Sequence, residues 1–186
     1  MNRITSVLLL TLLCFFAADA QKKASPNRQN DSWVSYISKK YGFKAIFPEK
    51  PAVIDMDVST PPVKRTNYMF SSMTSWGFFG VLYSDNPVLP VREKEDLSAD
   101  YEFLKSNLQN LKNAEIIGEK EINLGKISGR ELMIKSKDLV TIDRLFLVNK
   151  KLYQMVVTID YVDLENEPIN KQVKRFFDSF ALLEGK

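Results

Sequence analysis

Short segments in which apolar and polar residues alternate occupy much of the chain and predict β-strands. In 152–161 one face carries Tyr153, Met155, Val157, Ile159 and Tyr161, whereas the other carries the polar Gln154, Thr158 and Asp160. The predicted strands are 43–47, 67–72, 77–83, 116–124, 127–135, 140–148 and 152–161. Gly125-Lys126 and Asn149-Lys150 separate neighbouring segments, and Lys135-Ser136-Lys137 with Asp138 predicts another hairpin tip. Consecutive strands of this kind predict an antiparallel sheet with one face more deeply packed than the other.

Two further segments have helical spacing. The first has one apolar stripe, formed by Leu97, Tyr101, Leu104, Leu108 and Leu111. The second begins at Pro168, which suits a first helical turn, and its stripe is Ile169, Val173, Phe176 and Phe180. Burying each large side chain contributes about 1.5–3 kcal/mol, so both stripes should pack on the sheet. The pattern therefore predicts an α+β fold, with an antiparallel sheet of six to eight strands flanked by helices.

The first 32 residues have a different character. Asn2 and Arg3 precede an apolar run at 4–16, and Ala18-Asp19-Ala20 supplies small residues before Gln21. This layout predicts a secretory signal peptide at 1–20, although a buried first helix or an uncleaved anchor are alternatives. The polar stretch 21–32 predicts a flexible linker, and 33–186 a single domain. We therefore expect an exported protein, periplasmic or extracellular, with no membrane span after signal cleavage.

Missing residue types exclude several chemistries. The chain has no histidine, and its single cysteine, Cys14, lies in the predicted signal peptide. Leu13 before it is too large for a lipoprotein attachment site. Ser-His-Asp and Cys-His nucleophiles and His/Cys zinc sites are thus excluded for the mature chain. The net charge of +3 comes with short, scattered lysine pairs, so we expect no nucleic-acid binding.

Asp55 and Asp57 carry the strongest hint of catalysis. They follow the apolar Ala52-Val53-Ile54 and lie between Pro51 and the prolines at 61–62. Paired aspartates after a strand can hold Mg²⁺ or attack a phosphoryl group, but the supporting Ser/Thr, Lys and further acids of such enzymes are missing. Alternation instead predicts an edge strand, with both carboxylates on one wet face.

An acidic loop precedes the second helix. Its members are Asp160, Asp163, Glu165 and Glu167. Calcium could bind such a cluster, but the loop lacks the glycine and regular spacing of a calcium-binding hand. Acids before a helix also stabilise its N-terminus, which is a sufficient role. We therefore predict no catalytic, cofactor-binding or metal-binding residues.

Two stretches could form a binding surface. Trp76-Gly77-Phe78-Phe79-Gly80 could line an apolar groove, but aromatic residues are normal in strands, and we interpret this stretch as core. Residues 84–94, with Pro87 and Pro90, predict a long loop after a strand. Loops on a rigid sheet often hold binding residues, so any functional edge should be sought there first.

Several motifs together resemble PsbP-like domains. They are Tyr41-Gly42-Phe43 running into Phe47-Pro48 and Pro51, Gly125 with Gly129-Arg130-Glu131, Asn149-Lys150-Lys151-Leu152-Tyr153-Gln154, and Phe176-Phe177-Asp178-Ser179-Phe180. Their order and spacing match over about residues 41–182. The resemblance implies an α/β/α sandwich around an antiparallel sheet and an accessory or assembly role without a shared catalytic set. The signal peptide fits the exported bacterial branch, whose function is unknown.

The leading hypothesis is therefore a non-catalytic exported domain that binds a protein partner or a small apolar ligand at the cell envelope. The alternative is a carboxylate-based, metal-assisted hydrolase. A purely structural envelope protein cannot be separated from the first hypothesis by sequence, and the sequence does not predict an oligomeric state.

Overall fold

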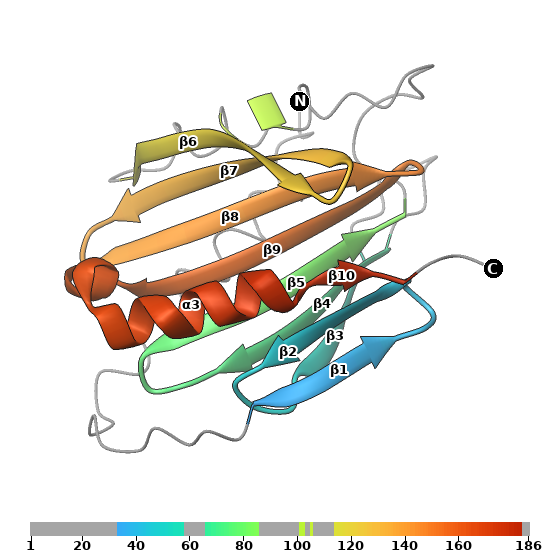
Figure 1. Cartoon of the computed structure of the whole chain (residues 1–186), viewed down its shortest axis with the longest axis horizontal. Helices are drawn as coiled ribbons and strands as arrows, with labels where there is room; N and C mark the ends of the chain where they lie inside the picture. Colours follow the sequence, from blue (N-terminus) through green and yellow to red (C-terminus); the bar gives the residue numbers. More distant parts are fainter. Residues whose placement is uncertain (1–32, 58–65, 86–100, 103–104, 106–113, 184–186) are drawn as a thin grey trace.

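The computed structural model describes residues 33–57, 66–85, 101–102, 105 and 114–183. These residues form two antiparallel sheets and a C-terminal helix (Figure 1). The strands are β1 (Val34–Ser38), β2 (Phe43–Phe47), β3 (Ala52–Asp57), β4 (Thr66–Met73), β5 (Gly77–Ser84), β6 (Ala114–Leu124), β7 (Ile127–Ser136), β8 (Leu139–Val148), β9 (Lys151–Asp160) and β10 (Ala181–Leu182). A 3₁₀ turn, η1 (Tyr161–Glu165), leads into the helix α3 (Glu167–Ser179).

Two predicted elements lie partly or wholly outside this part of the chain. The signal peptide and linker, residues 1–32, are outside it. Tyr101, Glu102 and Lys105 are helical, as the stripe at 97–111 predicts, but the other stripe leucines are outside the described residues. No helix within the described ranges is both long and apolar enough to cross a bilayer.

The large sheet has seven strands in the order β3-β4-β5-β9-β8-β7-β6, all antiparallel. This confirms the predicted antiparallel sheet. Its hairpins close where the sequence predicts turns, because the turn residues adopt positive φ: 62° at Gly125, 53° at Lys137, and 49° and 61° at Asn149 and Lys150. Two consecutive positive φ values match the twist of the flanking strands, which makes the β8–β9 turn tight.

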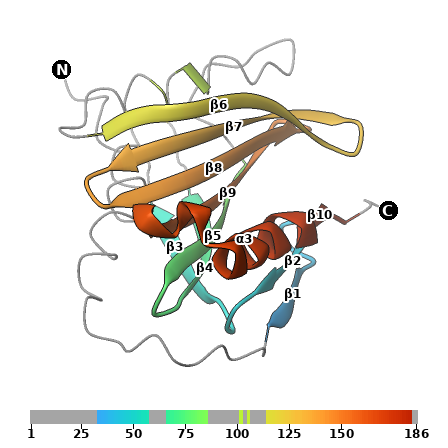
Figure 2. The ribbon, with the colours of Figure 1, turned by 60° about the vertical axis from the view of Figure 1, so that its left-hand side comes forward.

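A second sheet, in the order β1-β2-β10, was not predicted. The segment 43–47 is a strand as expected, but it lies here and not in the large sheet. The small sheet and α3 lie side by side over one face of the large sheet (Figures 1 and 2). Ser179 joins the two, because its Oγ accepts a hydrogen bond from Ile46 N at 2.8 Å and donates one to Phe176 O at 2.7 Å. The predicted sandwich is confirmed on one face of the large sheet, where the covering layer consists of α3 and the small sheet (Figure 1).

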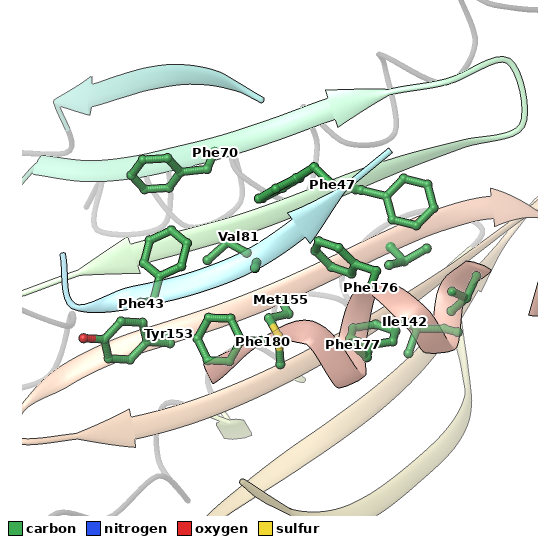
Figure 3. Close-up of a cluster of buried hydrophobic side chains, with 14 of the residues drawn as sticks. Phe43, Phe47, Phe70, Val81, Ile142, Tyr153, Met155, Phe176, Phe177 and Phe180 are labelled. Atoms are coloured by element: carbon green, nitrogen blue, oxygen red, sulfur yellow. The ribbon is translucent and has the colours of Figure 1, made fainter. Parts of the chain in front are cut away.

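The main core lies between this layer and the large sheet (Figure 3). Phe43 and Phe47 of β2, Phe70 of β4, Phe79 of β5 and Phe176 of α3 are fully buried. Their rings meet at centroid distances of 5.0–5.4 Å in edge-to-face arrangements, which aromatic quadrupoles favour. The stripe of the second predicted helix, now α3, therefore packs on the sheet as its spacing predicts.

Candidate functional site

Four tyrosines meet at one end of the main core. Tyr68, Tyr83 and Tyr153 are successive cross-strand neighbours on β4, β5 and β9, so their side chains share the face that the small sheet covers. Tyr41, from the turn between β1 and β2, packs over them, with its ring centroid 4.4 Å from that of Tyr68 and 4.9 Å from that of Tyr83. Register on the large sheet and one turn of the small sheet thus build this tyrosine cluster.

The turn holds Tyr41 in place. Gly42 N donates to Ser38 O at 2.9 Å, and Gly42 has a φ of 72°, which glycine adopts at little cost. The Tyr153 hydroxyl donates to the Tyr41 carbonyl oxygen at 2.9 Å, so a buried β9 side chain anchors the turn backbone. Tyr41 and Tyr68 remain partly exposed, whereas Tyr83 and Tyr153 are buried beneath them.

Lys40 adds a positive charge to the exposed side of the cluster. Its Nζ lies 4.9 Å from the Tyr41 ring centroid and 5.2 Å from that of Tyr68, within cation–π range. A hydrogen bond with Tyr41 is the main cause of a raised pKa at Lys40, and the Asp55 carboxylate makes a smaller contribution in the same direction. The lysine therefore stays charged at neutral pH.

The phenols of Tyr41, Tyr83 and Tyr153 stay protonated at neutral pH, because the pKa of each is raised. Burial raises the pKa of Tyr83 to about 12, with a further contribution from Asp85. Burial also raises the pKa of Tyr41, although Lys40 acts in the opposite direction. Neutral phenols are poor general bases, but they combine an apolar ring with a hydroxyl that donates and accepts hydrogen bonds. The arrangement suits recognition rather than proton abstraction.

A known fold has the same architecture. The solution structure of cyanobacterial PsbP (CyanoP) from Synechocystis matches with a TM-score of 0.57 and 14% identity, covering 87% of this chain and 98% of that one. The chain has a PsbP-like fold. The Saccharomyces cerevisiae Ran-binding protein Mog1p gives a TM-score of 0.44 at 11% identity and covers 82% of this chain and 96% of its own. No protein-family model and no curated protein matches the sequence.

The tyrosine cluster lies next to the predicted functional edge at 84–94 of this PsbP-like fold. Ser84 and Asp85 directly follow Tyr83, and the rest of that segment is outside the described residues. Sequence reasoning missed the cluster itself. Tyr68 and Tyr83 flank the predicted turn at Thr74-Ser75 almost symmetrically, and this symmetry was a signal that could have paired them.

β3, the strand that carries Asp55 and Asp57, is an edge strand of the large sheet, as predicted. Asp55 is exposed and pairs with Tyr68, whereas Ile54 and Met56 pair with Met69 and Asn67 on the opposite face. The side chain of Asp57 is outside the described set. Within the described ranges no three acidic residues converge as metal ligands would. The expectation of no catalytic or metal site remains a prediction.

The acidic loop lies around the start of α3. Asn166 is the N-cap, and its Oδ1 accepts a hydrogen bond from Ile169 N at 3.4 Å. Glu167 occupies the first turn and pairs with Lys171 at 2.7 Å. These contacts agree with the helix-stabilising role predicted for the loop, in which Glu167 faces the positive end of the helix.

The aromatic stretch at 76–80 belongs to the core of the PsbP-like fold. Phe78 and Phe79 are buried on opposite faces of β5. Trp76 is partly buried, with its ring centroid 5.0 Å from that of Phe79. The prediction that this stretch is core and not an open groove is therefore confirmed.

Proposed function

We propose that this protein is an exported, non-catalytic binding or accessory domain at the cell envelope, and that it binds a protein partner through the tyrosine cluster. The observation that carries the proposal is the partly exposed Tyr41–Tyr68 pair beneath Lys40. Tyrosine is enriched in the energetically dominant positions of protein interfaces, because its ring buries much area and its hydroxyl stays satisfied.

Preorganisation supports binding at this position. The turn hydrogen bond of Gly42 and the Tyr153 anchor hold Tyr41 before any partner arrives. A side chain that is already ordered loses little entropy on binding, whereas a mobile one costs about 0.5–1.5 kcal/mol. Tyr41 can therefore contribute most of its contact area to affinity.

Charge indicates what the partner presents. Lys40 is exposed at the rim of the cluster, with its Nζ over the Tyr41 and Tyr68 rings. The complementary surface carries a carboxylate beside an apolar side chain, so that both the ammonium group and the rings gain a contact. A small apolar ligand would use the rings but not the lysine.

Site-specific photocrosslinking in an exporting host tests this proposal. A photoreactive residue at position 68 should capture a discrete partner, and one at position 161 should not. Tyr161 is a matched control, because it is also a partly exposed tyrosine with a lysine over its ring, with Lys135 Nζ at 3.9 Å.

Affinity then separates specific capture from chance capture. With the captured partner purified, Tyr41→Ala and Lys40→Ala should each weaken binding, by at least tenfold for Tyr41→Ala, whereas Tyr161→Ala should leave it unchanged. Equal affinity for all variants overturns the assigned surface. A co-purifying small molecule, whose binding Lys40→Ala leaves intact, contradicts the protein partner. Finding the protein in the cytoplasm with residues 1–20 still attached would contradict export.

A further inference from the structure

β3 is the more regular of the two edges of the large sheet. Within the described residues the sheet ends at β3 on one side and at β6 on the other. The β6–β7 ladder shifts register between Ile116 and Gly118, and such a bulge discourages a further strand from pairing. The β3–β4 ladder runs through all six residues of β3 without a shift. Of the two edges, β3 therefore offers the template on which another strand can form.

Backbone hydrogen bonds elsewhere in the sheet show which groups of β3 point out of it. Thr74 N donates to Gly77 O at 2.8 Å, so these two residues form a hydrogen-bonded pair of the β4–β5 ladder. Such pairs take every second position of an antiparallel ladder, so the even-numbered residues of β4 bond to β5 and the odd-numbered ones to β3. The bond from Tyr161 N to Asp138 O, at 2.6 Å, gives the same alternation when it is followed across β9 and β5.

The outward groups of β3 belong to Val53 and Asp55. Ala52, Ile54 and Met56 lie opposite odd-numbered residues of β4 and use their N–H and C=O groups in that ladder. The N–H and C=O groups of Val53 and Asp55 consequently point away from β4, where no strand of the described chain lies. A row of donors and acceptors along a sheet edge is what an extended peptide pairs with.

The side chains of β3 indicate what such a peptide carries. Val53 is 50% exposed on the face that holds the main core, and Ile54 is 43% exposed on the opposite face. Apolar residues opposite them would cover both side chains, because directly opposed Cβ atoms lie about 4.5–5.5 Å apart. Asp55 is exposed on the same face as Val53, so a lysine or arginine opposite it would complement its charge.

A second copy of the chain does not supply that cation. Two copies of β3 related by a two-fold axis keep their faces aligned only when paired residues both have odd or both have even numbers. The odd-numbered residues of this stretch are Glu49, Pro51, Val53, Asp55 and Asp57, and none of them is a cation. Charge therefore favours a different protein as the source of the strand.

We propose that β3 is a strand-addition site. An extended segment of a protein partner pairs with the outward backbone groups of Val53 and Asp55. It places a lysine or arginine opposite Asp55 and apolar residues opposite Val53 and Ile54. The site does not depend on the proposed function, because it uses the backbone and side chains of β3 and none of the tyrosine cluster.

Synthetic peptides and NMR test the site in the full chain. The probe is a threonine-rich peptide with Lys-Ile-Val at its centre, which in antiparallel register places its lysine opposite Asp55 and its valine opposite Val53. The valine N–H then points to β3, and the isoleucine N–H points away from it. N-methylation of the valine should therefore weaken binding at least tenfold, whereas N-methylation of the isoleucine, the matched control, should leave it unchanged. The amide signals of Val53 and Asp55 should shift on binding, and that of Glu115 on β6 should not.

Charge reversal tests the chemistry of the added strand. The chain should bind this peptide about fivefold more tightly than an analogue with glutamate in place of lysine, and Asp55→Lys should invert the preference. Glu115→Lys is the control, because Glu115 is an exposed acid on the bulged edge, and it should leave the preference unchanged.

Three results would overturn the proposal. One is the absence of binding at millimolar peptide, or equal effects of the two N-methylations. Another is a preference for the lysine peptide that Asp55→Lys does not invert. The third is protection of the Val53 and Asp55 amides from hydrogen exchange without peptide, which would show that the chain itself or a second copy occupies the edge. The methylation comparison uses the wild-type chain, so it decides the question even if a variant does not fold.

Discussion

Replacing Gly129 by alanine should destabilise the fold, because the ring of Phe146 occupies the space that a Cβ would need. Gly129 of β7 lies directly opposite Phe146 of β8. An added Cβ would lie 2.4 Å from Phe146 Cε1 and 2.6 Å from the Leu145 carbonyl oxygen. Contacting carbon atoms normally lie about 3.5–4.0 Å apart, so Gly129→Ala requires movements of about 1 Å. Phe146 is buried, and the carbonyl belongs to the strand paired with β7, so neither moves freely.

The expected cost follows from overpacking. Extra methyl groups in packed cores cost about 1–3 kcal/mol, and Gly129→Ala should reach the upper end, about 3 kcal/mol, because both a ring and a backbone atom must move. For a chain of this size each 1 kcal/mol lowers Tm by about 2–4 °C, so Tm should fall by about 6–12 °C. Denaturant unfolding followed by tryptophan fluorescence, with thermal melts in parallel, measures the change.

Two comparisons isolate the cause. Gly118→Ala on β6 is the matched control, because its Cβ would meet Met133 Cβ at 3.2 Å, and it should cost less than about 1 kcal/mol. Phe146→Leu in a double-mutant cycle should rescue part of the Gly129→Ala loss. Effects that add to within about 0.5 kcal/mol would show that the two sites are not coupled and would refute the assigned ring contact.

Two further predictions concern charged groups. Because burial raises the pKa of Asp143 on β8 from its ordinary value of 3.8 to about 7, the native state binds the proton more tightly, so the free energy of unfolding falls as pH rises from about 4 to 7. Asp143→Asn should remove about 3 kcal/mol of the fall between pH 5 and pH 8, which urea titrations at these two pH values measure, and parallel pH profiles for wild type and variant would contradict it. Arg144 pairs with the buried Glu131 at 2.5 Å and lies over the Phe177 ring, whereas Lys120, which pairs with the same carboxylate, is 61% exposed. Arg144→Ala should therefore cost about 2 kcal/mol and Lys120→Ala less than about 1 kcal/mol in denaturant unfolding, and equal losses would show that burial does not decide the value of these pairs.

Strands β4 to β9 show how far alternation alone predicts the fold. Each predicted strand among them ends within two residues of its observed bounds, and the turns at 125–126 and 149–150 are correct. Hairpin partners follow from chain order, so the halves β3-β4-β5 and β6-β7-β8-β9 were predictable. The β5–β9 junction was not, because it joins segments far apart in the sequence.

The small sheet was beyond sequence reasoning for a different reason. Alternation identifies β2 as a strand with one buried face, but not the sheet to which it belongs. β1 has the pattern VSYIS, in which serines interrupt the apolar residues, and β10 has two residues. Their strand state depends on tertiary pairing with β2 and not on local preference.

The tyrosine cluster and the buried Asp143 depended on tertiary structure to different degrees. The tyrosine cluster needs the register of three strands and the Ser38–Gly42 turn, so no local spacing reveals it. Asp143, by contrast, was visible as a single acid within the apolar strand 139–148, LVTIDRLFLV. The sequence does not show that both faces of β8 are buried. Asp143 is a buried acid and not a surface one for this reason.

In the small sheet β2 lies between β1 and β10, which come from the two ends of the described chain. β1 begins at Val34, while Ala181 and Leu182 pair with Lys44 and Phe43, and Leu183 N donates to Gly42 O at 2.8 Å. This sheet cannot be completed until residues 181–182 have been synthesised, so β2 lacks one of its two neighbours until then.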